Sequence, residues 1–227
     1  MRRDTLFYRL FSQSPTLLFD LLDAAPPDAA DYRFDSVAVK EPTFEIDGVF
    51  LPPDEGEYPK TVYFCEVQFQ KDEELYERVF SEAFLYFYRQ RQRFDDWQAV
   101  IIYPSRSLEQ SNLHPYRALL DSDQVHRIYL QELGNLQQLP VGVGLLVLTT
   151  LSETQAAQQA RLLFERTQAE ISEPQRKAII ELIIMILSYR FTQLTRQEVE
   201  AMLDIRFEDT RLYQQLREES REEGREE

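Results

Sequence analysis

Three polar side chains in one strongly apolar stretch, residues 45–70, have the spacing of a small chemical site. Asp47 lies in the first of two expected strands, and Glu66 and Gln68 lie in the second. Side chains two apart on a strand share a face and lie about 6.6 Å apart, so Glu66 and Gln68 can contact one small ligand together. If the hairpin closes near Gly56, position 47 lies opposite position 66. The spacing therefore gathers three polar groups around one point.

Two facing carboxylates such as Asp47 and Glu66 repel one another unless a proton or a cation lies between them. A hard divalent cation such as Mg²⁺ takes carboxylate oxygens and keeps several waters, which makes it the simplest neutralising partner. The other interpretation is that both acids are ordinary solvent-facing strand residues. Each acid interrupts an apolar run and a long amphipathic helix follows, yet the pattern alone leaves both interpretations open.

The elements that must position these residues alternate between strands and helices. Asp72 has the character of an N-cap for a helix to about Arg93, whose apolar residues recur at helical spacing. The order strand, helix, strand predicts a right-handed crossover and a parallel pair. Strands are predicted at residues 36–40, 45–51, 60–70, 98–103, 125–130 and 141–149, and two short helices, 4–11 and 15–22, precede them.

From Ser152 the pattern is helical only. Ser152 with Gln155 and Thr195 with Glu198 are capping-box signatures, in which the two side chains bond each other's backbone N–H groups. We therefore predict an α/β core over residues 1–150 and a helical C-terminal segment over residues 151–227.

Composition narrows the classes of protein. The chain has 227 residues, one cysteine, two histidines and a formal net charge of −15. One cysteine excludes a disulfide framework and a cysteine-based zinc site, and the acidic charge argues against strong non-specific DNA binding. The most apolar run, residues 178–187, is shorter than the roughly 20 residues that span a bilayer. We expect a cytoplasmic protein with no membrane partner.

The arrangement of acid, turn and then Glu-x-Gln on the next strand, followed by a helix, resembles the PD-(D/E)XK nuclease superfamily. More narrowly, "VKEPTFEIDGVFLPP" with "VYFCEVQFQKDEELYERVFSEAFLYFYR" is similar to the Rpn family of recombination-promoting nucleases and transposase-like proteins, in a branch common in cyanobacteria. The likeness covers residues 4–103. It implies a restriction-endonuclease-like core, a mixed sheet flanked by helices.

The resemblance also implies roles for individual residues. Asp47 and Glu66 correspond to the acids that bind Mg²⁺, with Mn²⁺ as a substitute. The third motif position is usually Lys but here is Gln68, which can hydrogen-bond a water and cannot supply positive charge. The superfamily also uses an acid from an N-terminal helix, for which Asp20 is the first candidate and Asp23 the second.

Three cations are candidates for contacts with DNA. Lys40 and Lys71 lie near the expected site and could replace the missing lysine charge, and the alternative for each is an ordinary surface lysine. Arg78 could meet the phosphate backbone, and the alternative for it is an ion pair with Glu74 or Glu82 at helical spacing.

The function that the resemblance implies is Mg²⁺-dependent hydrolysis of double-stranded DNA, linked to recombination or transposition. Superfamily members often act as homodimers. The alternative is a weak or inactive nuclease-fold protein that serves as a binding or assembly module, which Gln68 and the acidic charge favour. A third interpretation is a helix-turn-helix in "LTRQEVEAML", a segment that lacks a basic stripe.

Overall fold

The computed structural model describes residues 3–39, 44–55, 58–172, 175–195, 198, 199, 201 and 203, without the side chains of residues 3–5, 36–39 and 44–47. The chain forms two compact units, residues 1–133 and 134–227. The elements of the first unit are α1 (Arg3–Gln13), α2 (Thr16–Phe19), β1 (Arg33–Val39), β2 (Phe44–Leu51), β3 (Thr61–Val67), α3 (Leu75–Arg89), β4 (Asp96–Tyr103), α4 (Arg117–Leu120) and β5 (Val125–Tyr129). Those of the second are α5 (Val141–Leu148), α6 (Glu153–Glu170) and α7 (Gln175–Arg190).

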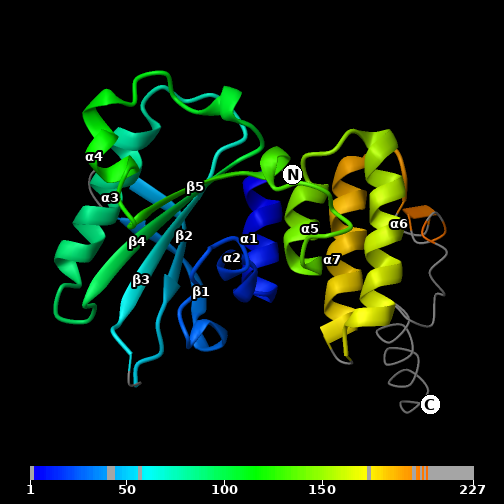
Figure 1. Ribbon diagram of the computed structural model, residues 1–227, viewed down its shortest axis with the longest axis horizontal. Coiled ribbons are helices and arrows are strands. Elements are labelled where there is room, and N and C mark those ends of the chain that lie inside the picture. The colour runs from blue at the N-terminus through cyan, green and yellow to red at the C-terminus, as the bar shows by residue number, and fades with distance from the viewer. Residues whose placement is uncertain are drawn as a thin grey trace, which may run out of the picture. The chain divides into compact units, whose positions relative to one another are not determined.

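The first unit is built on a five-stranded mixed sheet in the order β1-β2-β3-β4-β5 (Figure 1). The first three strands pair antiparallel, whereas β3, β4 and β5 run parallel. The long helix α3 connects β3 to β4, as a parallel pair requires. The α/β fold class, with a mixed sheet flanked by helices and a helical C-terminal segment, is therefore confirmed, as is the parallel pairing.

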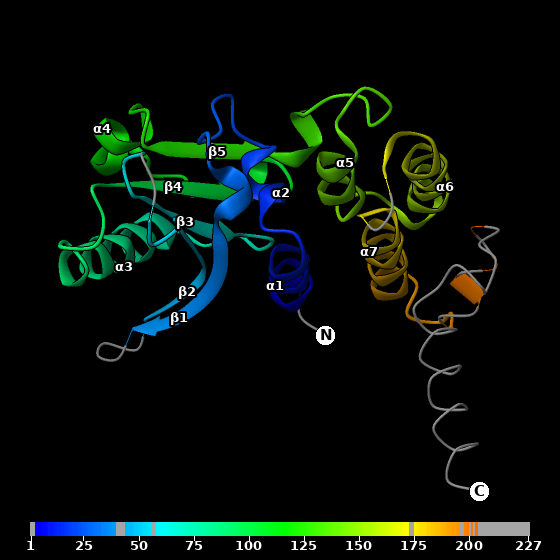
Figure 2. The same cartoon turned by 90° about the horizontal axis from the view of Figure 1, so that it is seen from below.

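Helices cover both faces of this sheet (Figures 1 and 2). Helix α3 packs against the face that carries Val62 and Phe64 of β3. Helices α1 and α2 pack through aromatic rings against the other face, where Phe19 meets Tyr63 at a centroid distance of 5.1 Å. Strand β3 is buried from Val62 to Val67, so both of its faces lie in a hydrophobic core.

The second unit contains three helices, in which a glycine permits close packing and side chains cap the helix starts. A Cβ on Gly144 of α5 would come within 2.6 Å of Leu163 in α6, so glycine permits this close approach. Ser152 caps α6 by accepting from the backbone N–H of Gln155, as predicted. Thr195 and Glu198 bond each other's backbone N–H groups, which confirms the second capping box. Among the described residues, no helix has both the length and the apolar character needed to cross a membrane.

One predicted strand is wrong. Residues 141–149 are rich in valine and leucine, yet the chain forms helix α5 there. An apolar run of eight residues has no periodicity that separates a buried strand from a buried helix, and seven of the eight α5 residues are buried. The boundary between the two units accordingly lies between Leu133 and Gly134, before this helix.

The remaining differences concern ends of elements. Strand β3 ends at Val67 where the sequence predicts a strand to residue 70, and α2 ends at Phe19 rather than near residue 22. Helix α3 begins at Leu75, because the Asp72 carboxylate accepts from the Glu74 backbone N–H and forms a turn before the helix.

Candidate functional site

Glu66 occupies the face of β3 that α3 covers, and it is 4% exposed. A carboxylate at this depth needs a charged partner, because burial strongly disfavours an isolated charge. The partner is Arg78 of α3, whose Nη1 lies 2.8 Å from Glu66 Oε1. The burial of Glu66 therefore excludes the interpretation that it is an ordinary solvent-facing strand residue.

Arg78 interacts with more than one acidic side chain. Its Nη2 lies 3.3 Å from Asp72 Oδ2, and the nearby carboxylate of Glu82 also acts on its charge. Burial alone would lower the pKa of Arg78, but the carboxylates of Glu66, Asp72 and Glu82 outweigh burial and raise that pKa. We call the three carboxylates around Arg78 the acid cluster. All three carboxylates act on the single guanidinium of Arg78.

The expectation that Arg78 pairs with Glu74 or Glu82 is corrected in part: Glu82 acts on its charge, but the ion pairs of Arg78 are with Glu66 and Asp72. Helical spacing favours such pairs on an exposed face, but Arg78 lies one turn into α3 and faces the sheet. Its guanidinium hydrogen-bonds Glu66 and Asp72, two residues that precede the helix.

Asp47 lies in β2, next to the end of the pairing with β3. The last paired position is Gly48 with Cys65, and continuing the antiparallel register by one residue would bring position 47 across from Glu66. The Asp47 side chain lies outside the described residues. Its backbone belongs to an irregularity, because β1 pairs Asp35 with Val49 but Val37 with Ile46.

This irregularity has the form of a β-bulge, with positions 47 and 48 of β2 facing the single position 36 of β1. Bulges bend a strand and re-aim a side chain, and they are frequent beside active sites. Gly48 is one of the two bulge residues. A Cβ at this position would come within 2.5 Å of the Phe34 ring, so the close approach requires glycine.

Gln68 lies beyond the end of β3. Its backbone N–H donates to Ile102 O at 2.9 Å, and its side-chain amide donates to Gln70 O. Because the strand ends at Val67, the predicted alternation from Glu66 to Gln68 and Gln70 does not continue as a strand. The backbone bond to β4 still anchors Gln68 two residues from Glu66.

The other predicted residues lie apart from the acid cluster. Asp20 follows Phe19 at the end of α2, on the face of the sheet opposite to Glu66, so the structure does not bring the two acids together. Asp23 acts electrostatically on His126 of β5. Lys71 pairs with Glu73 at 3.1 Å and donates to Ser111. Lys40 lies outside the described residues.

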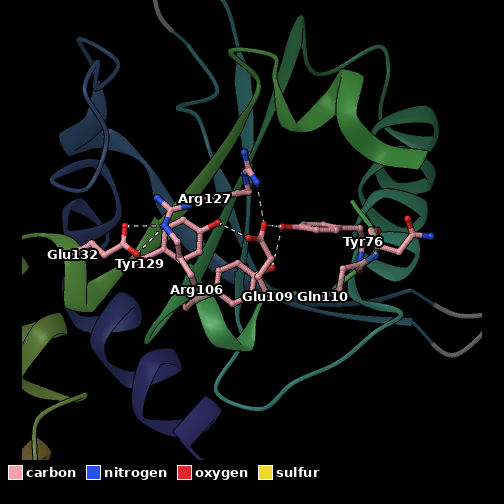
Figure 3. A network of polar contacts seen from close by, with 9 residues as sticks. Tyr76, Arg106, Glu109, Gln110, Arg127, Tyr129 and Glu132 are labelled. Atoms are coloured by element: carbon pink, nitrogen blue, oxygen red, sulfur yellow. Dashed lines mark hydrogen bonds and ion pairs between the residues drawn. The ribbon is translucent and has the colours of Figure 1, made fainter. Parts of the chain in front are cut away.

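A second polar centre, which sequence reasoning missed, surrounds Glu109 in the loop after β4 (Figure 3). The carboxylate accepts from the Tyr76 hydroxyl at 2.5 Å and the Tyr129 hydroxyl at 2.8 Å. It also accepts from Arg127 Nη1 at 3.1 Å. The Tyr103 hydroxyl in turn donates to Tyr76 at 3.2 Å. We call these five residues the Glu109 network.

Charge in the Glu109 network is balanced. Burial alone would raise the pKa of Glu109, but the bonds from Tyr76, Tyr129 and Arg127 outweigh burial and lower that pKa. Burial and the bond to Glu109 raise the pKa of Tyr129 to about 12. Outside the network, the Arg106 guanidinium stacks 4.0 Å above the Tyr129 ring and pairs with Glu132.

The Glu109 network holds the first turn of α3. The backbone N–H of Tyr76, one of the donors that a helix leaves unpaired at its start, donates to Gln110 Oε1 at 2.8 Å. Together with the Tyr76 hydroxyl bond, this fixes α3 two residues before Arg78. No pattern in the sequence reveals it, because Tyr76 and Glu109 are 33 residues apart.

The acid cluster gathers three carboxylates near one guanidinium. Among the residues whose side chains are described, no three acidic, histidine or cysteine side chains form a metal-binding group. Mg²⁺, however, commonly binds through one or two carboxylates and several waters.

Comparison with protein families yields one match. The model of the family described as "Protein of unknown function (DUF2887)" matches residues 3–203. The chain therefore belongs to this family. Comparison with curated proteins gives no match, and comparison with solved structures gives none either.

Proposed function

We propose that this protein of the DUF2887 family is a Mg²⁺-dependent endonuclease that hydrolyses phosphodiester bonds of double-stranded DNA. The observation that carries the proposal is the pairing register, whose last pair is Gly48–Cys65, so that a continuation by one residue would bring position 47 across from Glu66. The β-bulge at this point and the carboxylates around Arg78 support it. The likeness to PD-(D/E)XK nucleases supplies the reaction, and the Rpn likeness suggests a role in recombination or transposition.

Asp47 and Glu66 are the residues that would hold Mg²⁺, or Mn²⁺ in its place. A bound divalent ion acidifies water and neutralises charge on the phosphoryl oxygens. Glu66 is held in position by burial on β3 and by Arg78. Gln68, anchored through its backbone to Ile102, orients the attacking water through its amide.

Arg78 is our candidate for the positive charge that Gln68 lacks. Its guanidinium touches Glu66, whereas Lys71 is occupied by Glu73 and Ser111. An arginine remains charged at every working pH and offers several donors to phosphate oxygens. In this proposal Arg78 holds Glu66 before substrate binds and contacts the scissile phosphate afterwards. The enzyme works in the cytoplasm and as a homodimer when it cuts both strands.

An inactive, DNA- or protein-binding module is the second candidate. The observation in its favour is that Arg78 already neutralises Glu66, which is 4% exposed. Such a pair stabilises a fold without any metal, and Gln68 removes the usual catalytic lysine.

Cleavage of supercoiled plasmid and linear duplex DNA, with Mg²⁺, Mn²⁺ or EDTA, tests the proposal. We expect nicking or cutting that needs metal and that Glu66→Gln and Asp47→Asn each abolish. Glu77→Gln, which removes an exposed acid from the same helix as Arg78, is the control and should retain full activity. Cleavage that survives both site substitutions would falsify the proposal.

Two further variants separate the candidates. Gln68→Lys restores the usual third motif residue and should increase turnover, whereas Arg78→Lys should reduce it because a lysine cannot reproduce the two-nitrogen contact. If wild type is inactive with every metal, calorimetry with Mn²⁺ distinguishes the two kinds of inactive protein. Heat of binding that Glu66→Gln removes indicates a metal-binding relic, and no heat indicates a binding module without metal.

A further inference from the structure

A cationic hollow lies at the turn between α3 and β4, at the end of α3 away from Arg78. It has a volume of about 800 Å³, within the range of small-molecule sites. Four of its eight lining residues are arginine or lysine and one is acidic, in a chain whose net charge is −15. The lining residues are Lys60, Tyr88, Arg89, Gln90, Arg91, Gln92, Arg93 and Asp95.

The cations of this hollow differ in what they already contact. Arg93 pairs with Asp54 at 3.1 Å, and Lys60 Nζ donates to Asp54 O at 2.6 Å. Arg89 and Arg91 are exposed, and within the described part of the chain neither forms an ion pair. Guanidinium groups without carboxylate partners can donate to the oxygens of a phosphate.

An exposed aromatic ring adjoins these arginines. Tyr88 is 68% exposed, the largest exposed fraction among the exposed large hydrophobic side chains. Phe84, one helical turn earlier, packs edge-on against Trp97 at 5.0 Å and so anchors this side of the helix to the sheet. The Tyr88 ring therefore stands beside the cations on a rigid support. Aromatic rings next to cations are the arrangement that holds stacked nucleobases and their phosphates.

We propose that this hollow binds a phosphorylated nucleotide unit, with phosphate on Arg89 and Arg91 and the base stacked on Tyr88. The chemistry is shared by a free nucleotide and by a nucleic-acid strand with unpaired bases. Arginine matches phosphate oxygens with two parallel donors, and every base offers a face to Tyr88. The site is separate from the acid cluster, because Arg89 lies eleven residues beyond Arg78, about 16 Å along the helix.

Fluorescence anisotropy on the full chain tests the site independently of cleavage, because the experiment is done in EDTA. The probes are a labelled single-stranded 12-mer, the matching duplex and a fluorescent adenosine triphosphate analogue. We expect the single strand to bind and Arg89→Gln/Arg91→Gln to weaken it. The slope of log affinity against log salt should fall by roughly 0.7 for each phosphate that the variant no longer neutralises. The matched control, Arg161→Gln/Lys177→Gln, removes the same charge from the second unit and should change neither the affinity nor the slope.

Variants of Tyr88 test the stacking part of the proposal in the same binding experiment. Tyr88→Ala should weaken binding of the single strand by about 5- to 150-fold, and Tyr88→Phe, which keeps the ring, should retain it. Binding of the triphosphate analogue with the same dependence on Arg89, Arg91 and Tyr88 identifies a free-nucleotide site. Binding of the strand alone identifies a nucleic-acid anchor. The proposal is overturned if neither probe binds, if only the duplex binds, or if the arginine or Tyr88→Ala variants bind as wild type.

Discussion

The acid cluster and the Glu109 network are two buried carboxylate centres on the same face of one sheet. Glu66 of β3 pairs with Ile101 of β4, which pairs with Arg127 of β5, so the two centres lie on β3 and β5 with β4 between them. In open α/β sheets, ligands bind at the carboxyl ends of the strands. Both centres contain a glutamate and an arginine, yet their surroundings differ.

The two centres differ in the number of acids for each arginine and in the groups that donate hydrogen bonds to the carboxylates. Glu109 is a single carboxylate that accepts hydrogen bonds from an arginine and two tyrosine hydroxyls. Around Arg78, the carboxylates of Glu66, Asp72 and Glu82 all act on one guanidinium. A balanced centre stabilises the fold by itself, whereas in our proposal a bound cation neutralises carboxylates near Arg78.

The largest expected effect concerns stability. Glu109→Gln should lower the free energy of unfolding by about 3 kcal/mol, because Arg127 keeps its charge and loses its carboxylate. Glu66→Gln should cost less, because Arg78 keeps its ion pair with Asp72. Urea unfolding followed by the fluorescence of Trp97, the single tryptophan, reports on the α/β unit. Equal losses in the two variants would contradict the distinction.

The second effect is stabilisation by metal. At Mn²⁺ concentrations about twenty times its Kd, the α/β unit should gain about 1.8 kcal/mol, since the ion binds only the folded chain. Glu66→Gln should remove this gain, whereas Glu109→Gln should keep it despite its lower starting stability. Thermal unfolding with and without Mn²⁺ measures both. A gain that persists in Glu66→Gln would move the metal away from the acid cluster.

The two centres also differ in how far sequence predicts them. Strand alternation and hairpin register depend on neighbouring residues, so the antiparallel pairing of the two strands follows from local pattern, and the structure pairs Gly48 with Cys65 in that register. The partner of Arg78 does not follow, because helical spacing indicates Glu74 or Glu82 while packing brings Glu66 to it. Helix α5 was missed for a related reason, since its uniform apolar run has no period to distinguish it from a strand.

The contacts of the Glu109 network cannot be predicted from the sequence. Its residues come from α3, β4, β5 and the loop after β4, with Tyr129 and Glu109 20 residues apart. Nothing in the local sequence around Glu109 differs from an exposed polar loop. Only the parallel pairing of β4 with β5 brings Tyr103 and Tyr129 side by side, with stacked rings at 5.6 Å.

A smaller effect should follow from removing one hydroxyl. Tyr129→Phe takes one neutral donor from Glu109 and should cost about 1 kcal/mol of unfolding free energy. Tyr8→Phe, at an exposed ring of α1, is the control and should be neutral. Chemical denaturation resolves this difference when the two variants are compared with one m-value. A neutral Tyr129→Phe would mean that Tyr76 and Arg127 alone satisfy Glu109.

The smallest effect is a change in how stability depends on pH. The pKa of Glu109 is lowered in the folded chain from its ordinary 4.5, so the unfolded chain binds more protons between the two values. Its contribution is complete above pH 4.5 and is lost as the pH falls through the folded pKa. Glu109→Gln lacks this group, so the stability gap between variant and wild type should be constant from pH 7 to 5 and narrow below 4.5. Urea midpoints at pH 7, 5, 4 and 3 measure the gap, and a gap that stays constant to pH 3 would show that Glu109 is not held ionised by its tyrosines and Arg127.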